Sequence, residues 1–534
     1  MQNAFGGIRL QVRDPIHGEI EVFGEETLLM DSPEMQRLRN LHQLPAVHYA
    51  YPGATHTRFA HSLGVLELAT RIAEKVGITR ESREMRGLRA AALLDDVDEA
   101  PFNPLFKECY PTDYGSLSLE IRKTLATRVC EGANARINHL GRSIDIDFVL
   151  GILLKNPDSS FYSQIIGSEV GADRLDFLLR DAYYSGAAYG AGLDLSIISN
   201  LRRIQGKLVI ESSAVPQVDH LFSILFQMKR HVYDHKIARA VTVTLDYSIR
   251  KLLAKGHPLK VFLVKSSSPL TLHDDTSFLA RLGKLDPSTL QRFSERDFPH
   301  CIYATDAQLL KPEVANTLDL LRDKRSEAEM ELSGNVGSAV MLDFASSTWK
   351  IVPATAMESY EEGIGAVSLS KSEQLARWYS KRVSEPFREW RMYVFCDNPD
   401  LKMRTRAAQR CDELFRYLRV GSAQPVTKPI GLLKQAYKVA EGSFPPEEIR
   451  SYRRTILTLP PHIRKTLEKV VELNKPLTAD EVSKLTNRSR PVESLYLNYL
   501  EKQKLLRKTI ARRREVRFGL ADPRLVTIMH ELFE

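Results

Sequence analysis

The sequence predicts a mainly helical protein with an α+β appendage and a C-terminal winged helix-turn-helix. Between about residues 28 and 250, apolar residues recur at intervals of three and four, the period of a helix that buries one face. Between about 256 and 420, strand-like runs such as LKVFLVK, TWKIVPA and RMYVFCD alternate with helical stretches. From about 460 the order is a helix, a short helix, a longer helix and a basic alternating segment.

The 534 residues exceed what one hydrophobic core holds, so several domains are expected. We assign residues 1–255 to a helical core, 256–440 to an α+β region, and 441–534 to a linker and the winged helix. The core opens with IRLQVRDPIHGEIEVF, whose alternation predicts a short hairpin. Its helices are predicted from segments such as LGVLELATRIAEKVG and ADRLDFLLRDAYYSG.

The composition is that of an ordinary globular protein. No run approaches the roughly 18 uninterrupted apolar residues of a membrane span, and the N-terminus lacks the basic-then-apolar order of a signal peptide. We therefore expect a cytoplasmic protein with no membrane partner. The five cysteines are scattered and never spaced as CxxC, which indicates reduced thiols.

Positive charge is concentrated near the C-terminus. The segment from Lys484 to Arg517 holds eleven basic and three acidic side chains, and this excess equals the net charge of +8 for the whole chain. In a winged helix, Arg490 would lie near the start of the recognition helix, with Arg512, Arg513 and Arg514 at the wing tip. This arrangement favours contact with DNA or RNA phosphates. The alternative is a protein-interaction module whose arginines are solvated.

The segment LLDDVDEAPF places four carboxylates, Asp95, Asp96, Asp98 and Glu99, directly after an apolar helical run. Acidic side chains at a helix C-terminus face the negative end of the helix dipole, at a cost of a few tenths to about 1 kcal/mol each. They also repel one another at spacings of three and four. We therefore expect something positive beside them, either a divalent cation or, if a metal site has decayed, arginines such as Arg58 and Arg174.

Five segments surround this run and carry a family resemblance: SPEMQRLRNLHQL, YPGATHTRFAHSLGV, AALLDDVDEAPF, ADRLDFLLRD and KRHVYDHK. Together they resemble the HD-domain deoxynucleoside triphosphate triphosphohydrolases, which include the bacterial dGTPases and the animal enzyme with a sterile-alpha motif. The resemblance extends over roughly residues 10 to 250 and implies an HD-domain helical bundle. It also implies a homo-oligomer, because family members commonly assemble.

The resemblance further implies which residues form the site. The family's metal ligands fall on His61, Asp95, Asp96 and Asp173. Its substrate contacts fall on Gln43 and Arg58 beside the sugar and base, on Arg174 and Lys236 beside the phosphates, and on Asp181 and Tyr233 near the sugar.

The chain departs from the family at the catalytic positions. Asp95 stands where the family has the histidine of the HD pair, and Glu99 and Pro104 replace two further histidines. A third family histidine has no counterpart, and Asp113 is the nearest polar residue. One imidazole with three carboxylates is a hard ligand set that favours Mg²⁺ or Mn²⁺ over Zn²⁺ or Fe²⁺. Glu99 is then the candidate general base.

Three functional hypotheses follow. The first is a metal-dependent phosphohydrolase that cleaves a deoxynucleoside triphosphate, or another nucleoside triphosphate, to nucleoside and tripolyphosphate. The second is a catalytically weakened HD protein that binds a nucleotide and acts as a nucleic-acid-binding regulator through its winged helix. The third is an HD-type nuclease.

Overall fold

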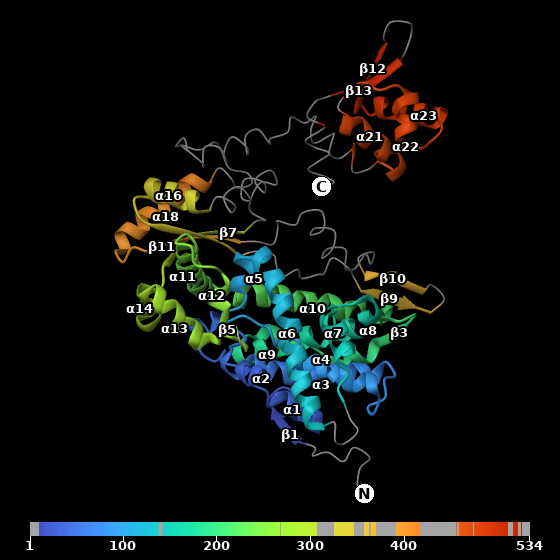
Figure 1. The fold of residues 1–534 in the computed structure, drawn as a ribbon. Helices are drawn as coiled ribbons and strands as arrows, with labels where there is room; N and C mark the ends of the chain where they lie inside the picture. The colour runs from blue at the N-terminus through green and yellow to red at the C-terminus, as the bar shows by residue number, and fades with distance from the viewer. Residues whose placement is uncertain are drawn as a thin grey trace. The chain divides into compact units, whose positions relative to one another are not determined.

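The computed structural model describes residues 10–137, 143–267, 269–306, 325–345, 357–362, 365–369, 391–416, 455–456, 459–473, 475–510, 516–521 and 525. The chain forms two compact units, residues 1–436 and 437–534. The described part is mainly helical with several small sheets, as predicted (Figure 1). The finer division at residue 255 stays a prediction.

The first unit opens with the predicted hairpin, an antiparallel pair of β1 (Leu10–Asp14) and β2 (Gly18–Val22). Helices then follow to residue 295: α1 (Gly24–Met30), α2 (Pro33–Arg37), α3 (Arg58–Lys75), α4 (Arg83–Leu94), α5 (Leu105–Cys109), α6 (Pro111–Ile137), α7 (Ile146–Leu153), α8 (Ser160–Gly167), α9 (Ala172–Ser185), α10 (Val215–Met228), α11 (Lys236–Leu253), α12 (Lys260–Leu263), α13 (Asp275–Leu285) and α14 (Pro287–Glu295).

Helix α3 lies at the centre of this bundle and packs against α4 and α9. It begins where the side chain of Thr57 accepts a hydrogen bond from the backbone of Ala60. Helix α4 is capped in the same way by Ser82. Most residues of α3 are buried, so this helix is covered on most of its surface rather than along one stripe. The site residues therefore extend from the most deeply packed helices of the unit.

Small sheets join distant segments of the first unit. A four-stranded sheet has the order β10 (Gly365–Ser368), β9 (Glu358–Glu361), β4 (Lys207–Glu211) and β3 (Leu201–Ile204). A three-stranded sheet has the order β7 (His300–Asp306), β11 (Arg391–Cys396) and β8 (Val340–Ala345), with helices α16 (Arg325–Val336) and α18 (Leu401–Arg416) beside it in sequence. A short pair joins β5 (Val264–Ser267) to β6 (Leu270–Leu272). Because β9 pairs with β4, the later region contributes strands to the helical core.

The second unit contains three helices, α21 (Pro461–Leu473), α22 (Ala479–Thr486) and α23 (Arg490–Lys502), followed by an antiparallel hairpin of β12 (Leu506–Ile510) and β13 (Val516–Leu520). Thr478 and Glu481 form a capping box at the start of α22. Glu493 is fully buried and accepts hydrogen bonds from Thr466 and Thr486, so it ties α23 to the two earlier helices. The order of elements agrees with a winged helix, and that assignment stays a prediction.

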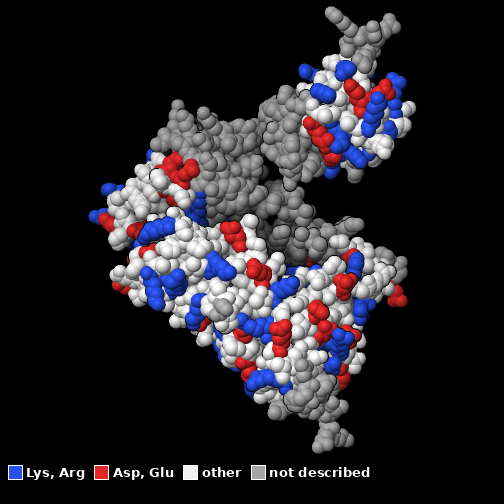
Figure 2. All heavy atoms as spheres, in the orientation of Figure 1, with Lys and Arg blue, Asp and Glu red and all other residues white. Residues whose placement is uncertain are grey.

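The surface carries both signs of charge. On the face of the first unit drawn in Figure 2, basic and acidic side chains are interspersed rather than gathered into one patch. In the described part of the chain, none of the helices combines the length and the hydropathy needed to cross a bilayer.

Candidate active site

His61 lies in the first turn of α3 and is almost fully buried. Its Nδ1 atom lies 2.7 Å from Asp176 Oδ2, and its Nε2 atom lies 3.0 Å from Asp173 Oδ1 and 3.9 Å from Asp96 Oδ2. Burial lowers the pKa of His61, but the hydrogen bonds to Asp173 and Asp176 outweigh burial and raise that pKa to about 10. The surrounding carboxylates therefore favour the protonated form of the ring.

Asp176 holds the His61 ring through its contact with Nδ1. It also accepts hydrogen bonds from both Nε and Nη2 of Arg180 and lies 2.6 Å from His17 Nε2. A side chain at Gly64 would overlap Asp176, so a glycine is required in α3 for the carboxylate to approach. Asp176 follows Asp173 by three residues in α9, and this spacing was the sequence signal that could have identified it.

The acid turn, residues 95–99, begins at the C-terminus of α4, and the chain's own cations surround it. Arg58 Nη1 donates to Asp96 Oδ2 over 2.9 Å, and Lys107 Nζ donates to Glu99 Oε2 over 3.0 Å. Arg122 Nε donates to Asp98 Oδ1 over 2.8 Å, while its Nη1 lies 3.6 Å from Asp95 Oδ1. Arg37, which is partly buried, donates to the backbone carbonyls of Val97 and Glu99. The expected positive charge is thus present, and it comes from three arginines and a lysine.

The first two carboxylates of the turn have opposite acidities. Burial raises the pKa of Asp95 to about 6, against the lowering effect of Arg122. Burial acts in the same direction at Asp96, but Arg58 and His61 outweigh it and hold the pKa of Asp96 well below its usual range. The surroundings therefore favour the charged form of Asp96 and the protonated form of Asp95.

The four predicted metal ligands come together at this place, but not as a metal centre. Among the described residues, no group of three or more His, Cys, Asp or Glu side chains is arranged to hold a metal ion. Arg58 and Arg122 lie against Asp96 and Asp95, and both ring nitrogens of His61 face carboxylates. A histidine ligand must be neutral with one nitrogen free for the ion. Arg58 and Arg122 thus compete with a divalent ion for Asp96 and Asp95, and the metal assignment stays a prediction.

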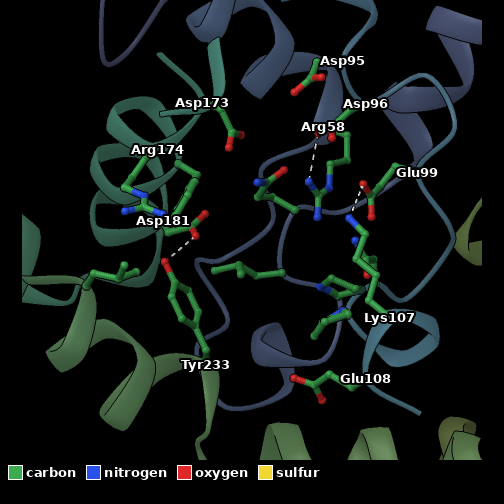
Figure 3. Close-up of a pocket in the computed structure, with 18 of the residues that line it drawn as sticks. Arg58, Asp95, Asp96, Glu99, Lys107, Glu108, Asp173, Arg174, Asp181 and Tyr233 are labelled. Carbon is green, nitrogen blue, oxygen red and sulfur yellow. Dashed lines mark hydrogen bonds and ion pairs between the residues drawn. The ribbon is translucent and has the colours of Figure 1, made fainter. Parts of the chain in front are cut away.

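A cavity of about 570 Å³ opens onto the acid turn. Figure 3 shows Arg58, Asp96, Glu99 and Lys107 on one side of it and Arg174, Asp181 and Tyr233 on another. Three of its lining residues are more than nine-tenths buried and have an oxygen with no hydrogen-bond partner: Gln43 Oε1, Glu99 Oε1 and Asn103 Oδ1. Buried polar atoms are nearly always paired, so these three indicate where a ligand or water binds.

The other predicted substrate residues divide into two groups. Gln43, Arg58, Arg174, Asp181 and Tyr233 all line the cavity. Tyr233, at the end of the π-helical turn Lys229–Tyr233, donates to Asp181 Oδ2 over 2.8 Å, and His56 Nε2 lies 2.7 Å from Asp181 Oδ1. Tyr233 is thereby fixed at the cavity wall.

Two predicted residues lie elsewhere. Lys236 begins α11 and is not among the residues that line the cavity. Asp113 is exposed in the first turn of α6 and does not line it either. Their assigned roles stay predictions. Conversely, Lys107, Arg122 and Arg239 line the cavity without having been predicted, and nothing in the sequence around them marks them.

The predicted nucleic-acid residues are only partly described. Arg490 starts α23, is 70% exposed, and has Nε 3.3 Å from Asp480 Oδ1. Arg512, Arg513 and Arg514 lie outside the described residues.

Fold and site together define a helical-bundle protein with a charged cavity of the size that holds a small ligand such as a nucleotide. No family model matches the chain. A solved structure of a hypothetical protein from Aquifex aeolicus matches 76% of this chain and 100% of its own, with a TM-score of 0.55 and 22% identity, and so shows the fold.

Sequence similarity to other proteins indicates which class of helical-bundle protein this is. The chain is 31% identical over 242 residues to the uncharacterized protein YwfO of Bacillus subtilis, a match that covers 44% of this chain and 53% of YwfO. It is 25% identical over 245 residues to the deoxynucleoside triphosphate triphosphohydrolase SAMHD1 homolog of Dictyostelium discoideum, covering 43% and 47%. The chain thus spans about half the length of the curated relatives it matches. Similarity to triphosphohydrolases and to a protein named for its HD domain supports an HD-domain, triphosphohydrolase-like family.

Proposed function

We propose that the cavity binds a nucleotide, most simply a deoxynucleoside triphosphate, and that the chain hydrolyses it to nucleoside and tripolyphosphate. The similarity to triphosphohydrolases supports a nucleotide phosphohydrolase in general. The observation that carries the proposal is Glu99 Oε1, a buried carboxylate oxygen without a partner in a cavity lined by Arg58, Arg122 and Arg174. This combination supports the proposal, because the hydrolysis needs a proton acceptor and cations that bind the phosphates.

The reaction assigns a role to each group. Guanidinium groups bind the phosphates through charge-assisted hydrogen bonds. Glu99 Oε1 accepts a hydrogen bond from water and takes its proton as the water oxygen bonds to the α-phosphorus. The bond from phosphorus to O5′ breaks, the departing oxygen takes a proton from solvent water, and Glu99 releases its own proton to solvent, which leaves nucleoside and tripolyphosphate. Lys107, on the other oxygen of Glu99, holds the carboxylate in orientation.

A second candidate is favoured by one observation. Every carboxylate of the acid turn has a cation of the chain as its partner, which is what a site retired from catalysis would show. In that case the cavity binds a nucleotide as a signal and the chain acts through its C-terminal unit. An HD-type nuclease is the third possibility.

One screen separates these candidates. Purified chain is incubated with each dNTP, each NTP and a single-stranded oligonucleotide, in Mg²⁺, Mn²⁺ or EDTA, and the products are separated by ion-exchange chromatography. Release of nucleoside and tripolyphosphate supports the first candidate, and shortened oligonucleotide supports the third. Nucleotide binding without turnover in any buffer supports the second. The same buffers test the preference for Mg²⁺ or Mn²⁺.

The base is tested by Glu99→Gln, which keeps the shape of the side chain but removes its basicity. We expect turnover to fall by roughly 10² to 10⁴, the usual contribution of a general base. Glu120→Gln, at an exposed position on α6, is the matched control and should keep full turnover. Equal turnover in Glu99→Gln and the control would remove Glu99 from the mechanism.

For the C-terminal unit we propose contact with DNA or RNA. Support comes from the exposed Arg490 and the excess of basic residues between Lys484 and Arg517. Replacing Arg490, Arg512, Arg513 and Arg514 together by Ala should weaken binding and flatten its dependence on salt, since each lost phosphate contact lowers the slope by about one. Identical slopes in the two proteins would indicate a protein partner instead.

A further inference from the structure

Arg122 joins the acid turn to α6 through two carboxylates at once. Its Nε atom donates to Asp98 Oδ1 over 2.8 Å, and its Nη1 atom lies 3.6 Å from Asp95 Oδ1. One turn earlier on the same helix, the hydroxyl of Ser118 also donates to Asp98. The side chain of Arg122 is 19% exposed and lines the cavity. It therefore bridges the turn and still faces the space where a ligand would bind.

We infer that Arg122 is a phosphate-binding residue and that it supplies, at the Asp95 end of the cavity, the positive charge that a divalent ion would otherwise bring. The inference rests on the proposed function for the identity of its ligand, a polyphosphate. It goes beyond that function because it makes the chain's own guanidinium the charge at the acid turn.

The charges around the cavity carry this inference. A divalent ion would have to bind Asp95 and Asp96, which already face Arg122 and Arg58. A divalent ion bound there would lie a few ångströms from both guanidinium groups, and the like charges would repel one another in a partly buried site. A phosphate is attracted by the same groups. Arg122 and Arg58 thus partly neutralise the two carboxylates that an ion would need, and they face the cavity where a phosphate would bind.

The guanidinium geometry adds a second argument. Arginine has five N–H donors in a planar fork and keeps its charge at any physiological pH. The contacts to Asp98 and Asp95 use Nε and Nη1. The other donors of the fork remain to bind phosphate oxygens from the cavity side.

The first measurement is a calorimetric titration of the full chain with MnCl₂ alone. We expect no saturable binding to the wild type up to roughly 1 mM, and a gain of Mn²⁺ binding in Arg122→Gln, where Asp95 and Asp98 become available as hard oxygen ligands. Binding of about one Mn²⁺ per wild-type chain in the micromolar range, lost in Asp96→Asn, would overturn the inference.

The second measurement is a titration with tripolyphosphate in EDTA. We expect wild type to bind without metal, and Arg122→Gln to bind roughly 10- to 100-fold more weakly, as for the loss of a charged hydrogen-bond donor. Arg83→Gln removes an exposed guanidinium that pairs with Asp145 far from the cavity lining, and it should bind like wild type. Equal affinity in Arg122→Gln and wild type would contradict the inference.

Arg122→Lys keeps the charge but loses the fork, so its tripolyphosphate affinity should lie between those of wild type and Arg122→Gln, with no gain of Mn²⁺ binding. Thermal melting shows which variants fold. If Arg122→Gln does not fold, the wild-type titrations and the Arg122→Lys variant still test the inference. Neither probe requires turnover, so loss of the proposed hydrolysis with tripolyphosphate binding retained would break only the proposed function.

Discussion

Two clusters of the first unit contain the same chemistry, carboxylates paired with arginines, yet differ in how completely the pairs are made. One is the acid turn with its cations. The other lies between α11 and α16 and consists of Asp246, Arg250, Arg325 and Glu329, which we call the α11–α16 cluster.

In the α11–α16 cluster every carboxylate oxygen has a donor. Asp246 accepts from Tyr110 and Arg250 and lies 2.9 Å from Arg325 Nη1, while Glu329 accepts from both arginines and from the backbone of Leu342. In the acid turn, by contrast, Glu99 keeps one buried oxygen unpaired. Ion pairs therefore do not by themselves mark a functional site, whereas an unsatisfied carboxylate in a cavity does.

The largest expected effect is a loss of stability when the α11–α16 cluster is disrupted. Asp246→Ala removes one of the two buried carboxylates that Arg250 and Arg325 share, so we expect the free energy of unfolding to fall by about 3–5 kcal/mol. Urea denaturation measures the change. Turnover or nucleotide binding per folded molecule should be unaffected. A loss below about 1 kcal/mol would mean that the cluster is solvated and contributes no more than a surface pair.

The helices could be predicted from the sequence because the spacing of apolar residues along a helix is a local property. The segment LGVLELATRIAEKVG, residues 63–77, predicts a helix, and the structure contains α3 there, which begins five residues earlier at Arg58. The sequence also gathered His61, Asp96 and Asp173 in one site, through a family resemblance. The structure places Asp173 Oδ1 at 3.0 Å and Asp96 Oδ2 at 3.9 Å from His61 Nε2.

The partners of the acid turn could not be predicted in this way. Arg122 lies 24 residues beyond Asp98, on a helix with no motif, and pairs with it because α6 packs beside the turn. Lys107 reaches Glu99 from α5 for the same reason. Periodicity specifies which face of a helix is buried, but it does not specify which charged residue of one helix meets which residue of another. The pairing of β9 with β4 is a long-range contact of the same kind.

The pH dependence of stability sharpens the comparison, because the pKa of Asp246 is lowered whereas the pKa of Asp95 is raised. Burial raises the pKa of Asp246, but Arg325 and Arg250 outweigh it and lower that pKa below the ordinary 3.8. Its stabilisation is therefore complete above pH 3.8 and is lost as pH falls through the lower native value. At Asp95 the native pKa of about 6 exceeds 3.8, so its contribution is present at low pH and is lost as pH rises through 6.

Two variants test these signs by urea denaturation between about pH 3 and 7. The advantage of wild type over Asp246→Asn should be constant at the upper end and shrink in the most acidic samples. Asp95→Asn should gain stability relative to wild type as pH rises toward neutrality. Parallel curves for either variant would refute the pKa direction assigned to that residue.

The smallest effect on stability is expected at Lys107, the most exposed of the cations at the acid turn. Its side chain is 47% exposed, so Lys107→Gln should change the free energy of unfolding by less than about 1 kcal/mol. Lys123→Gln, an exposed position on α6, serves as the control. If the acid turn is a working site, Lys107→Gln nevertheless lowers turnover by roughly tenfold, because Glu99 loses the group that orients it. Large destabilisation with unchanged turnover per folded molecule would reverse the comparison, since the acid turn would then behave as the α11–α16 cluster does.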